Sequence, residues 1–205
     1  DGTADLVQII DRDYGRSNID HAPNGLMPGM DNWIYNGRSP WRYRCIDGLW
    51  IKERTEIRGQ WGMTQDAHGR LFYNVNNSQL LGDLTPPNYM SRHRTYPSTA
   101  GLNLFVAADQ SVRTLRMNTA VNRGYLPEVL DDRGHLHMFA SSCSPLIYRG
   151  DHFPPGISGN AFVCDLAANL VKRNILHTGP LHLLAEPAHP NREFLASPDE
   201  RFRPV

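Results

Sequence analysis

Two stretches of this chain repeat one hairpin pattern. In the first, Gly25 leads to a turn at Asp31 and then to a strand-like aromatic run. In the second, Gly62 leads at the same spacing to a turn at His68 and then to a similar run. A unit of short strands and tight turns that recurs after a few tens of residues is typical of a β-propeller blade. The repeat therefore predicts an all-β fold, a β-propeller with long loops.

The residues just before each repeat are the first functional candidates. His21 precedes the first hairpin and Arg58 precedes the second. Propellers place their chemistry at the central channel, which the entry to each blade borders. His21 and Arg58 are therefore expected near a functional site.

Composition and missing motifs exclude several classes of function. The 21 basic and 21 acidic residues cancel, so no electrostatic footprint for nucleic acid is present. No apolar run approaches the length of a membrane span, so no direct span is expected. No G-x-S-x-G, H-E-x-x-H, P-loop or G-x-G-x-x-G motif occurs. Cys45, Cys143 and Cys164 have no metal-type spacing, which leaves one disulfide or three buried thiols open.

Strand and turn signals recur along the whole chain. Asp47-Gly48 between residues 41–46 and 49–53 is the strongest short hairpin signal. Residues 74–100 are polar and proline-rich without periodicity, which predicts a loop insertion. Further strands are expected at residues 6–10, 101–107, 112–117, 135–139, 144–148, 160–164, 170–175, 193–195 and 201–205.

This strand count predicts one domain over residues 1–205. It corresponds to roughly three to four blades, and a propeller closes only when its ring is complete. The chain starts at Asp1 without methionine, so it reads as a mature product, a fragment or the ordered part of something longer. We therefore expect a partial propeller whose other blades are supplied elsewhere.

Three stretches resemble a known family. They are SPLIYRGDHFPPGISGNAFVCD at 144–165, DERFRPV at 199–205 and DHAPNGLMPGMDNWIY at 20–35. All three resemble parts of the soluble quinoprotein glucose/sorbosone dehydrogenase propellers. Residues 58–74, 121–130 and 193–205 are more similar still to periplasmic propellers of Planctomycetes and Verrucomicrobia-type bacteria that are classed as membrane-bound dehydrogenases. In that group the propeller is often followed by a c-type haem domain.

The resemblance implies a role for each matching residue. In the quinoprotein family, pyrroloquinoline quinone lies across the channel mouth. Arg201 and Arg203 match arginines that anchor its carboxylates, and a strand would place both on one face. Arg149 stands where the family has a lysine near the quinone, and Arg58 matches an arginine at the quinone edge. His21 matches the general base that accepts the substrate hydroxyl proton.

The pattern also departs from the family. Gly59 stands where the family has an asparagine after the blade arginine. No metal site is predicted, although residues 74–83 loosely match the family's calcium loop. Haem c is expected only on a partner or on a further domain.

Three functions remain open at this point. The first is part of a periplasmic quinoprotein-type sugar or alcohol dehydrogenase that passes electrons to a c-type cytochrome. The second is a cofactor-less propeller that serves as a scaffold or docking subunit of a larger membrane-attached electron-transfer complex. The third is a carbohydrate-binding propeller without a redox role.

Each candidate residue also has a structural interpretation. Arg58 and Arg149 can instead bond loop carbonyls, and Arg201 and Arg203 can form a solvated strand face. His135 and His137 alternate as metal ligands would, but no third ligand is evident. The four tryptophans favour packing between blades over a sugar-stacking platform; they are Trp33, Trp41, Trp50 and Trp61.

Overall fold

The computed structural model describes residues 2–16, 21–95, 98–118 and 127–205. Their regular structure is almost entirely β, in three antiparallel sheets, two of four strands and one of five. Sheet A contains β1 (Asn24–Pro28), β2 (Ile34–Gly37), β3 (Trp41–Ile46) and β4 (Leu49–Arg54). Sheet B contains β5 (Met63–Gln65), β6 (Leu71–Val75), β7 (Ser78–Gly82) and β8 (Leu104–Phe105). Sheet C contains β9 (Ser142–Ile147), β10 (Ala161–Asp165), β11 (Leu170–Thr178) and β12 (Leu183–Pro187), and the short β13 (Leu195–Ala196) pairs with β11. Two 3-10 turns, Met90–Arg92 and Pro127–Val129, complete the elements.

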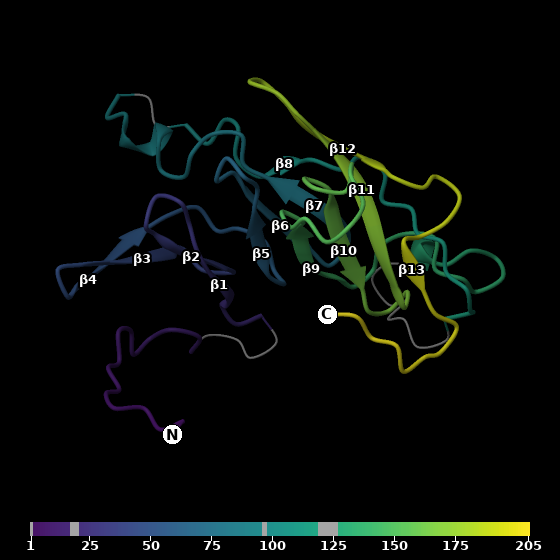
Figure 1. The fold of residues 1–205 in the computed structure, drawn as a ribbon, viewed down its shortest axis with the longest axis horizontal. Helices are drawn as coiled ribbons and strands as arrows, with labels where there is room; N and C mark the ends of the chain where they lie inside the picture. The colour runs from purple at the N-terminus through teal and green to yellow at the C-terminus, as the bar shows by residue number, and fades with distance from the viewer. Residues whose placement is uncertain (1, 17–20, 96–97, 119–126) are drawn as a thin grey trace.

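Strand order within each sheet follows the order of the chain. In every sheet four strands form an up-and-down meander in which each strand pairs with the next, and β13 is added beside β11. The first strands of the sheets lie next to one another, because β1 contacts β5 and β5 contacts β9. Sheet B therefore lies between sheets A and C (Figure 1).

The expected hairpins form where turn chemistry dictated them. β1 pairs with β2, and β5 pairs with β6, which confirms the repeated unit. β3 and β4 pair in register across Asp47 and Gly48, which have φ of 49° and 79°. Two successive positive φ angles define the turn that matches strand twist, and glycine and aspartate tolerate them.

The structure adds a third copy that the sequence conceals. A Cβ on Gly25 would lie 2.9 Å from the Cα of Gly62, and a Cβ on Gly62 would lie 3.6 Å from the Cα of Ser144. All three residues have positive φ, at 62°, 93° and 45°. Three left-handed residues thus stack in a row at the starts of β1, β5 and β9, and only two of them are glycine.

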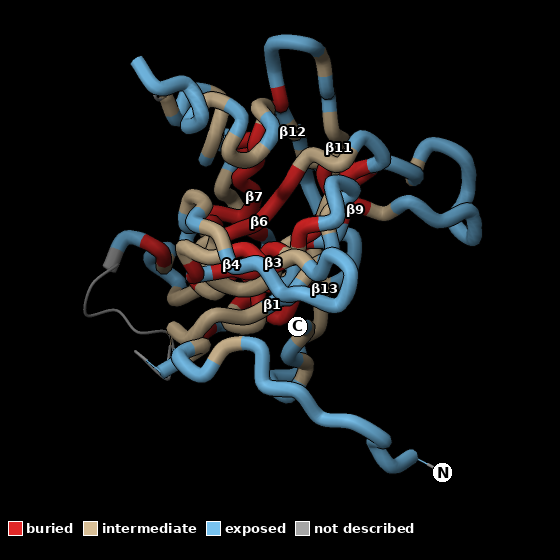
Figure 2. The backbone as a smooth tube through the Cα atoms, turned by 90° about the vertical axis from the view of Figure 1, so that its left-hand side faces the viewer, coloured by how far each residue is buried: buried red, intermediate tan, exposed pale blue. Residues whose placement is uncertain are grey.

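Two apolar clusters fill the spaces between the sheets. The smaller lies between sheets A and B and is built around Trp33, Tyr35, Leu71 and Tyr73. The larger joins sheets B and C with residues from the connecting segment, including Phe139. Figure 2 shows this buried interior as a red band along β6 and β7. The sheets are therefore packed as a series of layers around shared cores.

Several expected strands and one expected loop are wrong. Residues 74–100 are not a continuous loop, since β7 (Ser78–Gly82) is fully buried inside this range. Residues 6–10 form no strand and are exposed. Residues 112–117 form no strand, residues 135–139 make only isolated bridges at Leu136 and Met138, and residues 201–205 form a turn and coil. Of residues 101–107 only Leu104–Phe105 pairs as a strand. Among the described residues, no helix has the length and apolarity needed to cross a membrane.

An ion pair attaches the N-terminal segment to sheet A. Asp11 accepts hydrogen bonds from Lys52 at 2.8 Å and from the Tyr43 hydroxyl at 2.6 Å. These two partners stabilise the carboxylate and lower the pKa of Asp11 from 3.8 to about 2.

We expect this attachment to be lost only in strong acid. A depressed carboxyl pKa contributes stability above the unfolded value of 3.8, and that contribution disappears as the pH falls through about 2. An NMR titration of the Asp11 carboxyl carbon measures it directly. Lys52→Met should raise the midpoint, while Lys52→Arg should keep it low. A midpoint near 3.8 in the unaltered protein would show that the contact does not form.

Candidate functional site

Arg58 lies in a buried ion pair rather than at a channel. Its side chain is 1% exposed, and its Nε donates to Asp83 Oδ2 at 2.5 Å. Its Nη1 donates to the Thr55 hydroxyl and to the Glu56 carbonyl. Asp83 also accepts a hydrogen bond from the Tyr73 hydroxyl. Burial raises the pKa of Tyr73 above its usual value. Arg58 therefore ties the segment between β4 and β5 to the end of β7, and its bond to the Glu56 carbonyl is of the kind that the structural interpretation expects.

The other three arginines are exposed. Arg149 follows β9 and has no hydrogen bond to the described residues. The backbone N–H of Arg201 donates to Asp199 in a turn, and Arg203 Nη1 donates to the Leu166 carbonyl at 2.9 Å. The expectation that Arg201 and Arg203 share one strand face is wrong, because this segment is not a strand.

His21 is held by the segment that leads into β5. Its Nδ1 lies 2.9 Å from Gln60 Nε2, and its ring lies 5.9 Å from the Trp61 ring. Gln60 Oε1 accepts the backbone N–H of Asn76, so the amide presents its NH2 group to His21. An amide NH2 group can only donate, so Nδ1 is the acceptor of this hydrogen bond.

A cavity opens where β1, β5 and β9 begin. Its volume is about 670 Å³, and its wall includes the stacked residues Gly25, Gly62 and Ser144. Its other lining residues are Asn24, Trp61, Asn76, Ser141, Cys143, Leu166 and Val205. None of these side chains is charged, so the wall consists of amides, hydroxyls, one thiol, one indole and the aliphatic side chains of Leu166 and Val205. His21 is not a lining residue, although its ring lies 5.9 Å from the ring of Trp61.

Hydrogen bonds fix this wall in place. Asn24 donates to the Gln60 carbonyl and accepts the N–H of Gly62, which locks β1 to β5. The Trp61 indole donates to Asn76 Oδ1, and the N–H of Ser144 donates to the Trp61 carbonyl. The cavity is therefore pre-formed, with the Asn76 NH2 group left as a donor.

An apolar groove continues from this cavity along the same three strands. It has a volume of about 570 Å³ and shares Gly25, Gly62, Ser144 and Val205 with the polar cavity. Phe162 and Phe194 are among its lining residues, and the centroids of their rings lie 5.0 Å apart. The two hollows form one continuous surface, in which amide and hydroxyl side chains gather at the strand starts and aromatic rings lie beyond.

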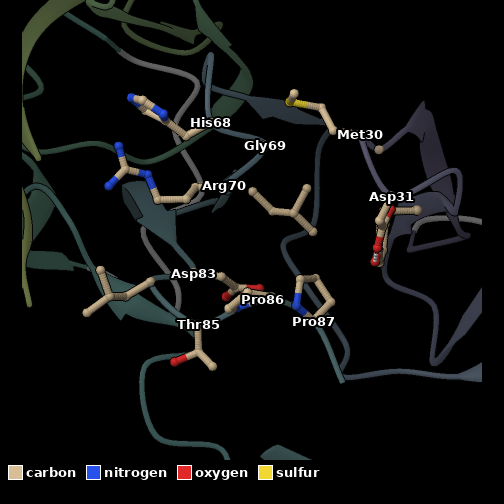
Figure 3. A pocket seen from close by; sticks show the side chains of 13 residues that line it. Met30, Asp31, His68, Gly69, Arg70, Asp83, Thr85, Pro86 and Pro87 are labelled. Atoms are coloured by element: carbon tan, nitrogen blue, oxygen red, sulfur yellow. Dashed lines mark hydrogen bonds between the residues drawn. The ribbon is translucent and has the colours of Figure 1, made fainter. Parts of the chain in front are cut away.

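A further cavity of about 270 Å³ lies at the opposite ends of β1 and β5, between the two repeated turns (Figure 3). Met30 packs on Gly69 there, while Asp31 and Arg70 lie on opposite sides. Arg70 pairs with Asp66 at 2.7 Å, and Asp31 accepts the Tyr35 hydroxyl at 2.7 Å. Because these charged groups already bond other residues of the chain, this cavity has fewer free polar groups for a ligand.

His135 and His137, which alternate in the sequence as metal ligands would, contact different partners. His135 lies 3.7 Å from Asp131, and His137 lies within hydrogen-bond distance of the Glu128 carbonyl. Within residues 2–16, 21–95, 98–118 and 127–205, no group of three or more His, Cys, Asp or Glu side chains is placed to hold a metal.

The residues around the polar cavity do not fit a quinone that carries carboxylates. Such a group requires cations in the wall, and none of the lining side chains is cationic. Arg58 has a buried Nη2 without a partner, but this residue lines none of the three cavities described above. Gly59 cannot carry the family's asparagine either, because its φ is 56° and a Cβ would lie 2.8 Å from the Cβ of Tyr73.

Three residues around His21 and the cavity wall were not predicted from the sequence. His21 was identified, but Gln60, Trp61 and Asn76 were not named as site residues. The signal was their position: Gln60 and Trp61 immediately precede the second repeat glycine. Asp20 and most of the motif at 121–130 lie outside the described residues.

Comparison with known proteins places the chain in a family without supplying an activity. No curated protein and no solved structure matches it. Residues 1–205, the entire chain, match the family described as a domain of unknown function, DUF7133. The chain with its three meander sheets and its neutral cavity therefore belongs to the DUF7133 family.

Proposed function

We propose that this chain forms three blades of a β-propeller and binds a neutral sugar or alcohol in the cavity at the starts of β1, β5 and β9. The observation that carries the proposal is the composition of the cavity wall. An indole, amides and hydroxyls line it, and no charged side chain does. Aromatic faces with a few oriented polar groups are the usual means of fixing a neutral polar ligand.

The arrangement of sheets supports the propeller. Each sheet contains a meander of four strands, to which sheet C adds the short β13, and the first strands lie side by side with the cavity at their starts. In a propeller the first strands of the blades line the channel, where ligands bind. Further blades, from other parts of the polypeptide or from partner subunits, would complete the ring.

In this proposal Trp61 contacts the ligand, and His21 holds the Trp61 ring in position. The Trp61 indole N–H is already used by Asn76, so its ring face is the part left for a ligand. His21 packs against that ring and fixes Gln60. The module would work without a cofactor of its own, as a binding or docking part of a larger periplasmic electron-transfer assembly with a c-type cytochrome.

A dehydrogenase of the quinoprotein type is the second candidate. It is favoured by the contacts of His21 and Arg203 with Trp61 and Leu166, two residues of the cavity wall. Because the wall holds no cation, the described residues do not supply the anchor for pyrroloquinoline quinone, with or without calcium. We therefore assign no oxidation step to them.

Removing the Trp61 ring should weaken sugar binding about tenfold, since ring stacking contributes roughly 1 kcal/mol beyond its buried area. Saturation-transfer NMR with a panel of neutral monosaccharides and polyols identifies a ligand, and a titration gives the affinity. Trp61→Ala is compared with Trp50→Ala, which removes a 40% exposed ring of β4 outside the cavity.

Trp50→Ala should leave the affinity unchanged. Urea unfolding of both variants controls for loss of fold. The proposal fails if no member of the panel gives a saturation-transfer signal, or if the two tryptophan variants lose affinity equally.

A further inference from the structure

Two cysteines face each other across sheet C. Cys143 on β9 and Cys164 on β10 are direct partners in the antiparallel register. Residues that are directly opposite in such a pair place their side chains on the same face. Cys143 lines the polar cavity and Cys164 lines the adjoining groove, so both thiols border the continuous surface described above.

The hydrogen bonds of the ladder fix the type of this pair. The N–H of Leu166 donates to the Ser141 carbonyl, which makes Asp165 and Ser142 a non-hydrogen-bonded pair. The next pair along, Cys164 and Cys143, is then of the hydrogen-bonded type, with a Cα separation of about 5.5 Å. That separation is within the usual range for a disulfide.

We propose that Cys143 and Cys164 are a redox modification site that forms a reversible cross-strand disulfide. Opposite Cβ atoms in a sheet are about 4.5–5.5 Å apart, whereas a disulfide needs about 3.5–4.5 Å. Forming the disulfide therefore pulls β9 and β10 together and leaves the disulfide strained. Strained disulfides are the easily reduced ones. The register shift between Phe162 and Cys164 gives β10 local freedom for this movement.

The oxidant class is a small-molecule disulfide such as oxidised glutathione. The Cys164 thiolate, on the partly exposed residue, attacks one sulfur of the oxidant and releases one glutathione thiol. The Cys143 thiolate then attacks the Cys164 sulfur of the mixed disulfide and releases the second. Two protein thiols become one disulfide while one small disulfide becomes two thiols, so electrons and protons balance.

Burial makes the reaction slow at neutral pH. Desolvation raises the pKa of the Cys143 thiol to about 12, and it raises the pKa of Cys164 as well. Because the thiolate is the reacting species, the rate should rise about tenfold per pH unit below these values.

The test counts thiols in the unaltered protein before and after incubation with oxidised glutathione at pH 8. We expect intact mass spectrometry to show a loss of two hydrogens and peptide mapping to join Cys143 to Cys164. The melting temperature should rise by about 3–6 °C, because the bond restricts the unfolded chain, and excess reduced glutathione should reverse both changes.

Two variants sharpen the result. Cys164→Ser should abolish the loss of two hydrogens, while Cys45→Ser, which alters the exposed cysteine of β3, should leave it intact. The inference is overturned if the unaltered protein keeps both thiols, or if it only gains glutathione without an internal bond. Sugar binding is not needed for this test, so it can fail or succeed independently of the proposed function.

Discussion

Arg58→Met should destabilise the protein by about 3–5 kcal/mol, since removing one partner leaves a buried charge unpaired. Arg58 and Asp83 are each 1% exposed and joined at 2.5 Å. Without the guanidinium, the Asp83 carboxylate keeps only the Tyr73 hydroxyl and the N–H of Asn103. Its charge must then be buried without a cation or be neutralised by a proton.

Urea unfolding measures this loss. Arg149→Met is the matched control, because Arg149 is exposed and has no hydrogen bond to the described residues, so its change should stay within about 0.5 kcal/mol. The double variant Arg58→Met with Asp83→Leu should recover part of the stability, since it removes both charges. Equal stability of Arg58→Met and Arg149→Met would return Arg58 to the list of ligand-binding candidates.

Asp165→Ala should cost at least about 4 kcal/mol, because each buried N–H left without an acceptor costs about 1–3 kcal/mol. Asp165 is fully buried at the end of β10. Its Oδ2 accepts the N–H groups of Ala140 and Ser141, and its Oδ1 accepts those of Ala167 and Ala168. One carboxylate thus organises both the entry to β9 and the turn between β10 and β11.

The control for Asp165 is Asp151→Ala. The Asp151 side chain is 98% exposed and contacts only the equally exposed His152, so removing it should change stability by less than about 0.5 kcal/mol. Urea unfolding with tryptophan fluorescence compares the two. If Asp165→Ala unfolds at the same urea concentration as Asp151→Ala, the four hydrogen bonds do not contribute as the geometry implies.

Local turn chemistry made part of the fold predictable. Asp47-Gly48 fixed one hairpin because only a few residues tolerate two positive φ angles. The repeated glycines fixed two more. The third copy was concealed because Ser144 adopts the left-handed region without being glycine. A non-glycine residue there is uncommon and is identified only from the folded backbone.

Tertiary contacts decided the elements that the sequence could not predict. β7 contains Gln79, whose fully buried side chain bonds the Asp109 carbonyl and accepts from Asn174. Nothing in the local sequence indicates these distant partners. Conversely, residues 6–10 are rich in strand-forming apolar residues, but Leu6 and Val7 remain exposed and no strand among the described residues pairs with them.

The candidate site, like the fold, could be predicted only where a local sequence signal marked the residue. His21 stands out because it precedes a repeat, whereas the sequence favours a packing role for its neighbour Trp61 over a sugar-stacking one. Arg58 matched a motif at the level of sequence, yet its role is set by Asp83, which lies 25 positions later and becomes its partner only on folding. Ion-pair partners are determined by packing, so a motif alone cannot assign the function of an arginine.

The most direct test of the central claim is an absorption titration of the protein with pyrroloquinoline quinone and calcium, followed by dye reduction with sugars. A neutral cavity wall predicts no saturable spectral shift and no His21-dependent turnover, while sugar binding persists. A saturable shift at one quinone per chain, with dye reduction that His21→Ala abolishes in a folded protein, would contradict the account and establish the dehydrogenase.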